Sequence, residues 1–159
     1  MNPSSFLHNS LIVIGGASLD ILHFVGQTVR SAGGSGLYTS LAAQRLGMRV
    51  TMIAPRPRPV PSELELAMQR LDWRGKEVPP EELPTFEIAY PGNGQTEYLN
   101  IWWRSEADLS LEYIPDELPA GLVYCIPMID THHQVEFLQH FKSQGRIIAC
   151  GTHQGAVNN

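Results

Sequence analysis

The sequence has 159 residues, enough for one domain with a hydrophobic core but short for two, and 43% of them are hydrophobic. The net charge of -5, with two lysines and nine scattered arginines, argues against a nucleic-acid binder, because neutralising phosphates takes clustered basic residues. No run approaches the roughly 20 apolar residues that cross a bilayer, and the first ten residues do not resemble a signal peptide, so we expect a cytoplasmic protein with no membrane partner.

The first third of the chain has the order of elements that builds a parallel α/β sheet. Its hydrophobic runs predict three strands, a helix and a fourth strand at 11–15, 21–25, 27–29, 37–46 and 49–54. Gly26 is expected to form the turn between the second and third strands. The glycine-rich segment 32–36 opens the helix, and Gly47 is expected to end it.

The middle of the chain is predicted to interrupt this pattern with a β-hairpin. Prolines at every second position make 55–61 extended, and Ser62 is expected to cap a helix that runs to about residue 73. Alternating segments at 85–90 and 96–103 flank the turn sequence PGNGQ. The aromatic residues of the second segment could contact a ligand, a partner or the chain's own core, and they are Tyr98, Trp102 and Trp103. Trp102 and Trp103 are expected on opposite faces of the strand.

The last third returns to the α/β pattern, with strands at 122–126 and 146–150 around a helix at 131–143. About four parallel strands are expected in all, and the last of them is expected to form an open edge of the sheet. Cys125 and Cys150 lie in apolar runs, so both are predicted to be buried, reduced thiols.

Two features of the first third could bind a polar ligand. In Gly33-Gly34-Ser35-Gly36 the glycines permit close backbone approach to a ligand at a helix N-terminus, but a tight strand-to-helix turn would need them as well. Asp20 follows the first strand, where α/β proteins bind ligands, and could accept hydrogen bonds from sugar hydroxyls. It could equally accept them from nearby backbone N–H groups.

Several other kinds of site are disfavoured by their missing motifs. The sequence has no GxxxxGK[ST] phosphate loop, no dinucleotide-binding glycine pattern and no GxSxG nucleophile motif. A metal site is not expected either. His132 and His133 would point about 100° apart on a helix, and no paired ligand spacing links them to Cys125, Cys150 or His153.

The run at 32–54, AGGSGLYTSLAAQRLGMRVTMIA, closely resembles the first signature region of the ribokinase-like (PfkB) carbohydrate kinases. The matching residues are Gly33, Gly34, Gly36, Ala42, Ala43, Arg45, Leu46 and Gly47. The segments before and after it also fit the family. The resemblance implies that 1–159 is the substrate-binding, amino-terminal half of a three-layer α/β/α sandwich, with a β-hairpin lid at about 84–104.

The resemblance also implies a function: transfer of a phosphoryl group from ATP, with Mg²⁺, to a hydroxyl of a sugar, polyol or nucleoside. Asp20 would hydrogen-bond substrate hydroxyls, and Gly33, Gly34 and Gly36 would let the substrate lie against the backbone. The family's catalytic GxGD segment does not occur in this sequence. We therefore expect the ATP-binding half to be absent and the chain alone to be inactive.

The sequence departs from the family at three places. Tyr38 stands where many members have a substrate-contacting asparagine, the proline run 55–61 replaces a glycine- and aspartate-bearing loop, and Pro127 replaces a strand-end glutamate. The substrate is therefore expected to differ from ribose, unless the pocket no longer binds sugar. The alternatives are a non-catalytic sugar- or nucleoside-binding module and a protein that assembles through its lid. Lids of this family often pair, which suggests a homodimer.

Overall fold

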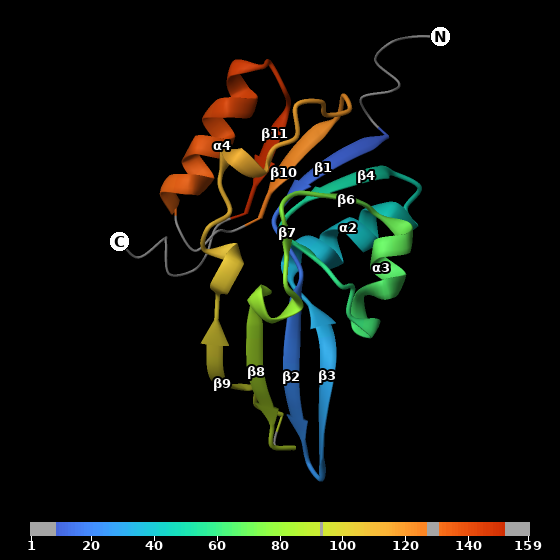
Figure 1. The fold of residues 1–159 in the computed structure, drawn as a ribbon, viewed down its shortest axis with the longest axis vertical. Coiled ribbons are helices and arrows are strands. Elements are labelled where there is room, and N and C mark those ends of the chain that lie inside the picture. Colours follow the sequence, from blue (N-terminus) through green and yellow to red (C-terminus); the bar gives the residue numbers. More distant parts are fainter. Residues whose placement is uncertain (1–8, 93, 127–130, 152–159) are drawn as a thin grey trace.

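The computed structural model describes residues 9–92, 94–126 and 131–151. It shows an α/β body from which a second group of strands projects at one end (Figure 1). The body combines segments that are far apart in the sequence, because strands from residues 10–53 lie beside strands from residues 122–150. Among the described residues, no helix is long and apolar enough to span a membrane.

The body is built on a five-stranded parallel sheet with the order β11-β10-β1-β4-β6. Its strands are β1 (Ser10–Ile14), β4 (Arg49–Ile53), β6 (Asp72–Arg74), β10 (Leu122–Cys125) and β11 (Ile148–Cys150). The central strand β1 is buried at every residue, and Ile12 lies between Thr51 of β4 and Val123 of β10. A strand covered on both faces needs apolar residues throughout, which is why the run in β1 does not alternate.

Helices cover both faces of this sheet. On one face, α2 (Ser35–Arg45) and α3 (Glu65–Arg70) pack against a core that includes Leu11 and Val13. On the other face, α4 (Thr131–Ser143) buries Phe137 against Ile12 and Ile14. Successive residues of β1 thus enter opposite cores. The three layers confirm the predicted partial α/β/α sandwich.

The second sheet, which we call the lid sheet, has the order β3-β2-β8-β9. Its strands are β2 (Ser18–Phe24), β3 (Gln27–Gly33), β8 (Thr85–Tyr90) and β9 (Glu97–Trp102). The predicted hairpin is present as the antiparallel pair β8 and β9, and β8 runs parallel to β2. Because β2 and β3 extend to residues 18 and 33, longer than predicted, Asp20 and Gly33 belong to the lid sheet.

The helix predicted from Ser62 to about residue 73 is wrong in its second half. Ser62–Leu64 is a 3₁₀ turn, α3 ends at Arg70, and Trp73 is buried in the short strand β6 beside Met52. Pairing with β4 and burial of the indole outweigh the local helical pattern. Ser62 caps no helix, and its hydroxyl donates to the Glu63 carboxylate instead.

Several other expectations at the edges of the body can be compared with the structure. The proline run is extended in part: β5 (Arg56–Pro57) pairs with β7 (Glu77–Val78), whereas Arg58 and Pro59 form a bend. The sheet has five parallel strands rather than about four, and β11 is an edge strand, as predicted. The expectation of two buried cysteines is wrong for Cys150, which is exposed in the edge strand β11, whereas Cys125 is buried.

Candidate functional site

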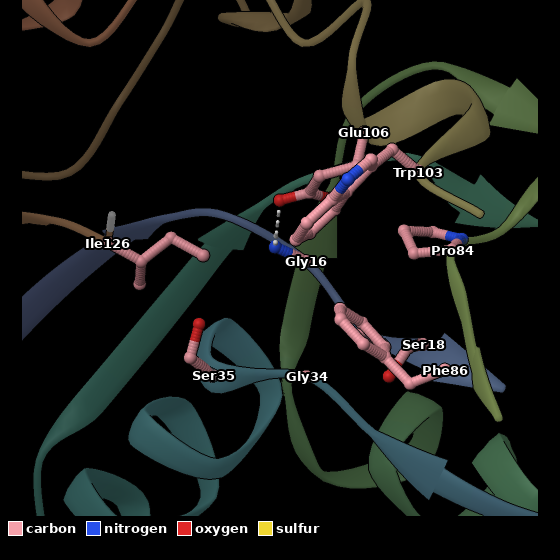
Figure 2. A pocket seen from close by; sticks show the side chains of 10 residues that line it. Gly16, Ser18, Gly34, Ser35, Pro84, Phe86, Trp103, Glu106 and Ile126 are labelled. Carbon is pink, nitrogen blue, oxygen red and sulfur yellow. Dashed lines mark hydrogen bonds between the residues drawn. The ribbon is translucent and has the colours of Figure 1, made fainter. Parts of the chain in front are cut away.

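A pocket of about 130 Å³ lies where the carboxyl end of β1, the start of α2 and the lid sheet meet (Figure 2). It is lined by Gly16, Ala17, Ser18, Gly34, Ser35, Pro84, Phe86, Trp103, Glu106 and Ile126. The carboxyl ends of parallel strands are where open α/β sheets usually bind ligands, because the connections leave a crevice there. The pocket is therefore the first candidate for a binding site.

The glycines at the start of α2 bring that helix close to the turn between β1 and β2. Gly34 has a φ of +101°, and a Cβ there would lie 2.5 Å from the carbonyl oxygen of Gly16. A Cβ on Gly36 would lie 2.1 Å from the carbonyl oxygen of Gly15. Both glycines are thus required by the tight approach itself. Gly34 also lines the pocket, whereas Gly36 does not.

Asp20 and Gly33 lie side by side in the lid sheet, outside the lining of the pocket. A Cβ on Gly33 would lie 2.0 Å from Oδ2 of Asp20, so the glycine makes room for this carboxylate. The backbone N–H of Phe86 donates to Oδ1 of Asp20 over 3.3 Å, and the Phe86 ring lines the pocket. Burial raises the pKa of Asp20, while hydrogen bonds from Ser18 and Phe86 act in the opposite direction.

Glu106 is the most strongly perturbed carboxyl group of the pocket, and the sequence interpretation missed it. The residue follows β9 in the 3₁₀ turn Arg104–Glu106, within a polar stretch that is typical of a solvated loop. Its Oε1 accepts a hydrogen bond of 3.3 Å from the Gly16 N–H (Figure 2). Its Oε2 is buried and has no hydrogen-bond partner among the described residues. Burial raises the pKa of Glu106 to about 7, while the Gly16 N–H acts to lower it.

Two aromatic rings form the lid side of the pocket. Trp103 and Phe86 meet edge to face, with ring centroids 5.1 Å apart and an interplanar angle of 89°. Trp102 is the last residue of β9 and is partly exposed, whereas Trp103 follows the strand and lines the pocket, so the prediction that both lie in one strand is wrong. Such an aromatic wall offers a ligand a flat apolar surface next to the polar groups of Gly16 and Glu106.

Arg104 and Ser105 hold this turn against the start of β8. The Arg104 guanidinium donates to the carbonyl oxygen of Leu83 and to Oγ1 of Thr85, and the Ser105 hydroxyl donates to the carbonyl oxygen of Glu82. Arg104 has a φ of +47°, an uncommon value for a residue other than glycine. These contacts position both Trp103 and Glu106 at the pocket.

The remaining family departures lie away from the pocket or outside the described residues. Tyr38 is 59% exposed on α2, does not line the pocket, and donates from its hydroxyl to the carbonyl oxygen of Ala32. Pro127 and His153 lie outside the described residues. Within the described ranges, no group of three or more histidine, cysteine or acidic residues is placed to hold a metal ion.

Comparisons with known proteins identify the fold. No protein-family model matches the sequence, and no curated protein matches it either. Solved structures do match: ribokinase from Giardia lamblia has a TM-score of 0.73 and 16% identity over 91% of this chain and 52% of that one. Nucleoside kinase from Methanocaldococcus jannaschii has a TM-score of 0.74 and 14% identity, covering 95% of this chain and 55% of its own.

A third match is fructokinase with bound ATP from Xylella fastidiosa, with a TM-score of 0.70 and 15% identity over 92% of this chain and 52% of that chain. The fold of the described chain is therefore ribokinase-like, as the signature residues predicted. The chain spans about half the length of each of these structures.

Proposed function

We propose that this chain is the substrate-binding, amino-terminal portion of an ATP-dependent carbohydrate or nucleoside kinase. The observation that carries the proposal is the pocket between the carboxyl end of β1, the start of α2 and the lid sheet. It occupies the crevice that this class of fold uses for ligands. The similar folds of a ribokinase, a nucleoside kinase and a fructokinase support a hydroxyl-bearing small molecule as the substrate.

The residues that the family resemblance singles out would contact this substrate from the β2–β3 side. Asp20 would accept hydrogen bonds from substrate hydroxyls, and Gly33, which has no Cβ, makes room for its carboxylate. Gly34 lines the pocket, so its backbone is accessible to a ligand. Gly36 would act less directly, because it lets the first turn of α2 approach the end of β1.

The 159 residues do not fit a complete ATP site. The GxGD segment that supplies the base and the anion-binding backbone in this family does not occur in the sequence. We therefore assign no residue of this chain to phosphoryl transfer or to Mg²⁺. The chain alone is expected to bind substrate without turning it over.

The lid sheet supports a second role, self-association. All six residues of β9 are exposed, and they include the apolar side chains Tyr98, Leu99 and Ile101. An exposed row of large apolar side chains on a sheet is typical of an interaction surface. A homodimer that pairs through the lid sheet would cover them, and a non-catalytic interaction protein built on this surface is the alternative function.

Calorimetric titration of the chain with ribose, fructose, adenosine and inosine tests the proposal. Saturable binding of one compound, weakened by D20N and unchanged by D116N at an exposed site, would support a substrate-binding role. If the chain alone binds the compound and produces no ADP when ATP and Mg²⁺ are added, the result would agree with the missing GxGD segment. Absence of any binding, together with dimers in analytical ultracentrifugation, would favour the interaction protein instead.

A further inference from the structure

The Glu106 carboxyl group leaves part of its hydrogen-bonding capacity unused at the wall of the pocket. A carboxylate can accept about four hydrogen bonds, and Glu106 accepts one from Gly16. Its Oε2 is buried with no hydrogen-bond partner among the described residues, although the residue lines the pocket. Burying such an oxygen without a partner costs about 1–3 kcal/mol or more. Since Glu106 lines the pocket, a ligand bound there would be the nearest source of the missing donor.

The surrounding chain is built to keep Glu106 in this place. A Cβ on Gly16 would lie 2.6 Å from Oε2, so a glycine at this position is what makes room for the carboxyl group. The neighbouring Arg104 and Ser105 are tied to the segment before β8 by several hydrogen bonds. The hydrogen bond from Gly16 and the anchored backbone of the 104–106 turn therefore both hold the carboxyl group in place.

The opposite side of the pocket indicates the charge of the ligand. Figure 2 shows the Glu106 carboxyl and the Ser35 hydroxyl on opposite sides of Gly16. Ser35 is the first residue of the eleven-residue helix α2, whose N-terminus carries the positive end of the helix dipole. That end disfavours a cation and favours an oxygen acceptor. The Phe86 and Trp103 rings add an apolar wall to the pocket.

We propose that Glu106 is a ligand-binding residue, whose free Oε2 accepts a hydrogen bond from one hydroxyl of a neutral, polyhydroxylated ligand while another ligand oxygen faces Ser35 and the N-terminus of α2. The inference rests on the proposed function for the class of ligand, and it assigns the binding to a residue outside the family signature. It also predicts discrimination, because an ammonium group in place of the ligand oxygen that faces Ser35 would meet the positive end of α2.

Ligand binding and protonation of Glu106 are coupled in this arrangement. A hydroxyl that donates to Oε2 favours the ionised carboxylate, so the pKa of Glu106 should fall from about 7 when the pocket fills. The titratable side chains that interact with its charge are Tyr113 and Cys125, whose pKa values burial raises, to about 12 for Cys125. Both are neutral near pH 7 and do not compete for this proton.

Two measurements test the inference. In the first, wild-type, E106Q and E112Q chains are titrated at pH 8 with ribose, fructose, adenosine and inosine. The binding of glucose is also compared with that of glucosamine, in which an ammonium group replaces one hydroxyl. We expect E106Q to bind the preferred neutral compound about tenfold to a hundredfold more weakly, since the lost bond is to a charged group. E112Q, changed at an exposed site on the next 3₁₀ turn, should bind as the wild type does.

The second measurement follows the Glu106 carboxyl carbon by NMR in a ¹³C-glutamate-labelled chain, assigned with E106Q, during titration with the same compounds and with glycerol at molar concentration. A shift of its titration midpoint to lower pH supports the inference. If a sugar or nucleoside binds equally to E106Q and leaves that midpoint unchanged, the inference is overturned and the proposed function stands. If only glycerol moves the midpoint, the inference stands and the proposed function fails. If no compound binds to the chain and the midpoint never moves, both are overturned.

Discussion

Glu106 should make the folded chain less stable as the pH rises through the neutral range. Burial raises the pKa of this carboxyl from 4.5 to about 7, so between these two values the folded chain holds a proton that the unfolded chain has released. The free energy of unfolding is unaffected below pH 4.5 and falls progressively up to pH 7. At about 1.4 kcal/mol per pH unit, the loss reaches about 3 kcal/mol.

The E106Q variant should remove this loss, because a glutamine keeps the shape and the acceptor for Gly16 but cannot ionise. We expect urea unfolding to show that the free energy of unfolding of the wild type falls by about 3 kcal/mol relative to that of E106Q between pH 5 and pH 8. The raised pKa of Asp20 and the lowered pKa values of Glu63 and Asp72 also affect stability, but they act in both proteins and cancel in the difference.

The exposed variant E112Q is the matched control, and its difference from wild type should stay constant between pH 5 and pH 8. Parallel pH profiles for wild type and E106Q would refute the reasoning, because they would mean that the Glu106 carboxyl is solvated in solution. A profile that diverges only below pH 5 would refute it as well, since an ordinary carboxyl titrates there.

Three further predictions concern the glycine turn, the core and the lid sheet. G34A should lower the unfolding free energy by about 2 kcal/mol or more, because its Cβ would meet the carbonyl oxygen of Gly16 at a positive φ. G47A, at a φ of +85° with open space around it, should lose less unfolding free energy in the same urea titration. F137A should cost about 3–5 kcal/mol, because this fully buried ring fills the core under α4, and calorimetry should show a correspondingly lower melting temperature. I101E should convert the proposed lid-sheet dimer to monomer in analytical ultracentrifugation without lowering the melting temperature by more than a few degrees, because Ile101 is 43% exposed.

Local sequence pattern predicted the elements whose hydrogen bonds and burial follow from their own residues. The unbroken apolar run of β1 predicted a buried strand, and the glycines before α2 predicted a ligand approach or a tight strand-to-helix turn, of which the structure shows the turn, with Gly34 at a positive φ. The turn between β8 and β9 predicted an antiparallel pair, which the structure contains. In each case a few neighbouring residues determine the geometry.

The features that the sequence did not reveal depend on contacts between distant segments. Trp73 looked like the end of a helix, and only its place beside Met52 makes it part of a strand. Glu106 looked like a solvated residue among polar neighbours, and only the distant Gly16 and the lid sheet bury its carboxyl. Residue type alone does not reveal burial of this kind, and the one nearby signal is Gly16, whose missing Cβ makes room for Oε2.

The connection between β2 and β8 has a consequence for how the molecule folds. The bond from Phe86 to Asp20 joins residues 66 positions apart, so the lid sheet has to close a long loop before its parallel pairing contributes any stability. The body strands β1 and β4 pair across a shorter stretch of chain, and they hold several fully buried side chains. Amide hydrogens of β2, β8 and β9 should therefore exchange with solvent through openings that leave the body intact, which makes the lid sheet a separate cooperative unit hinged on the pocket.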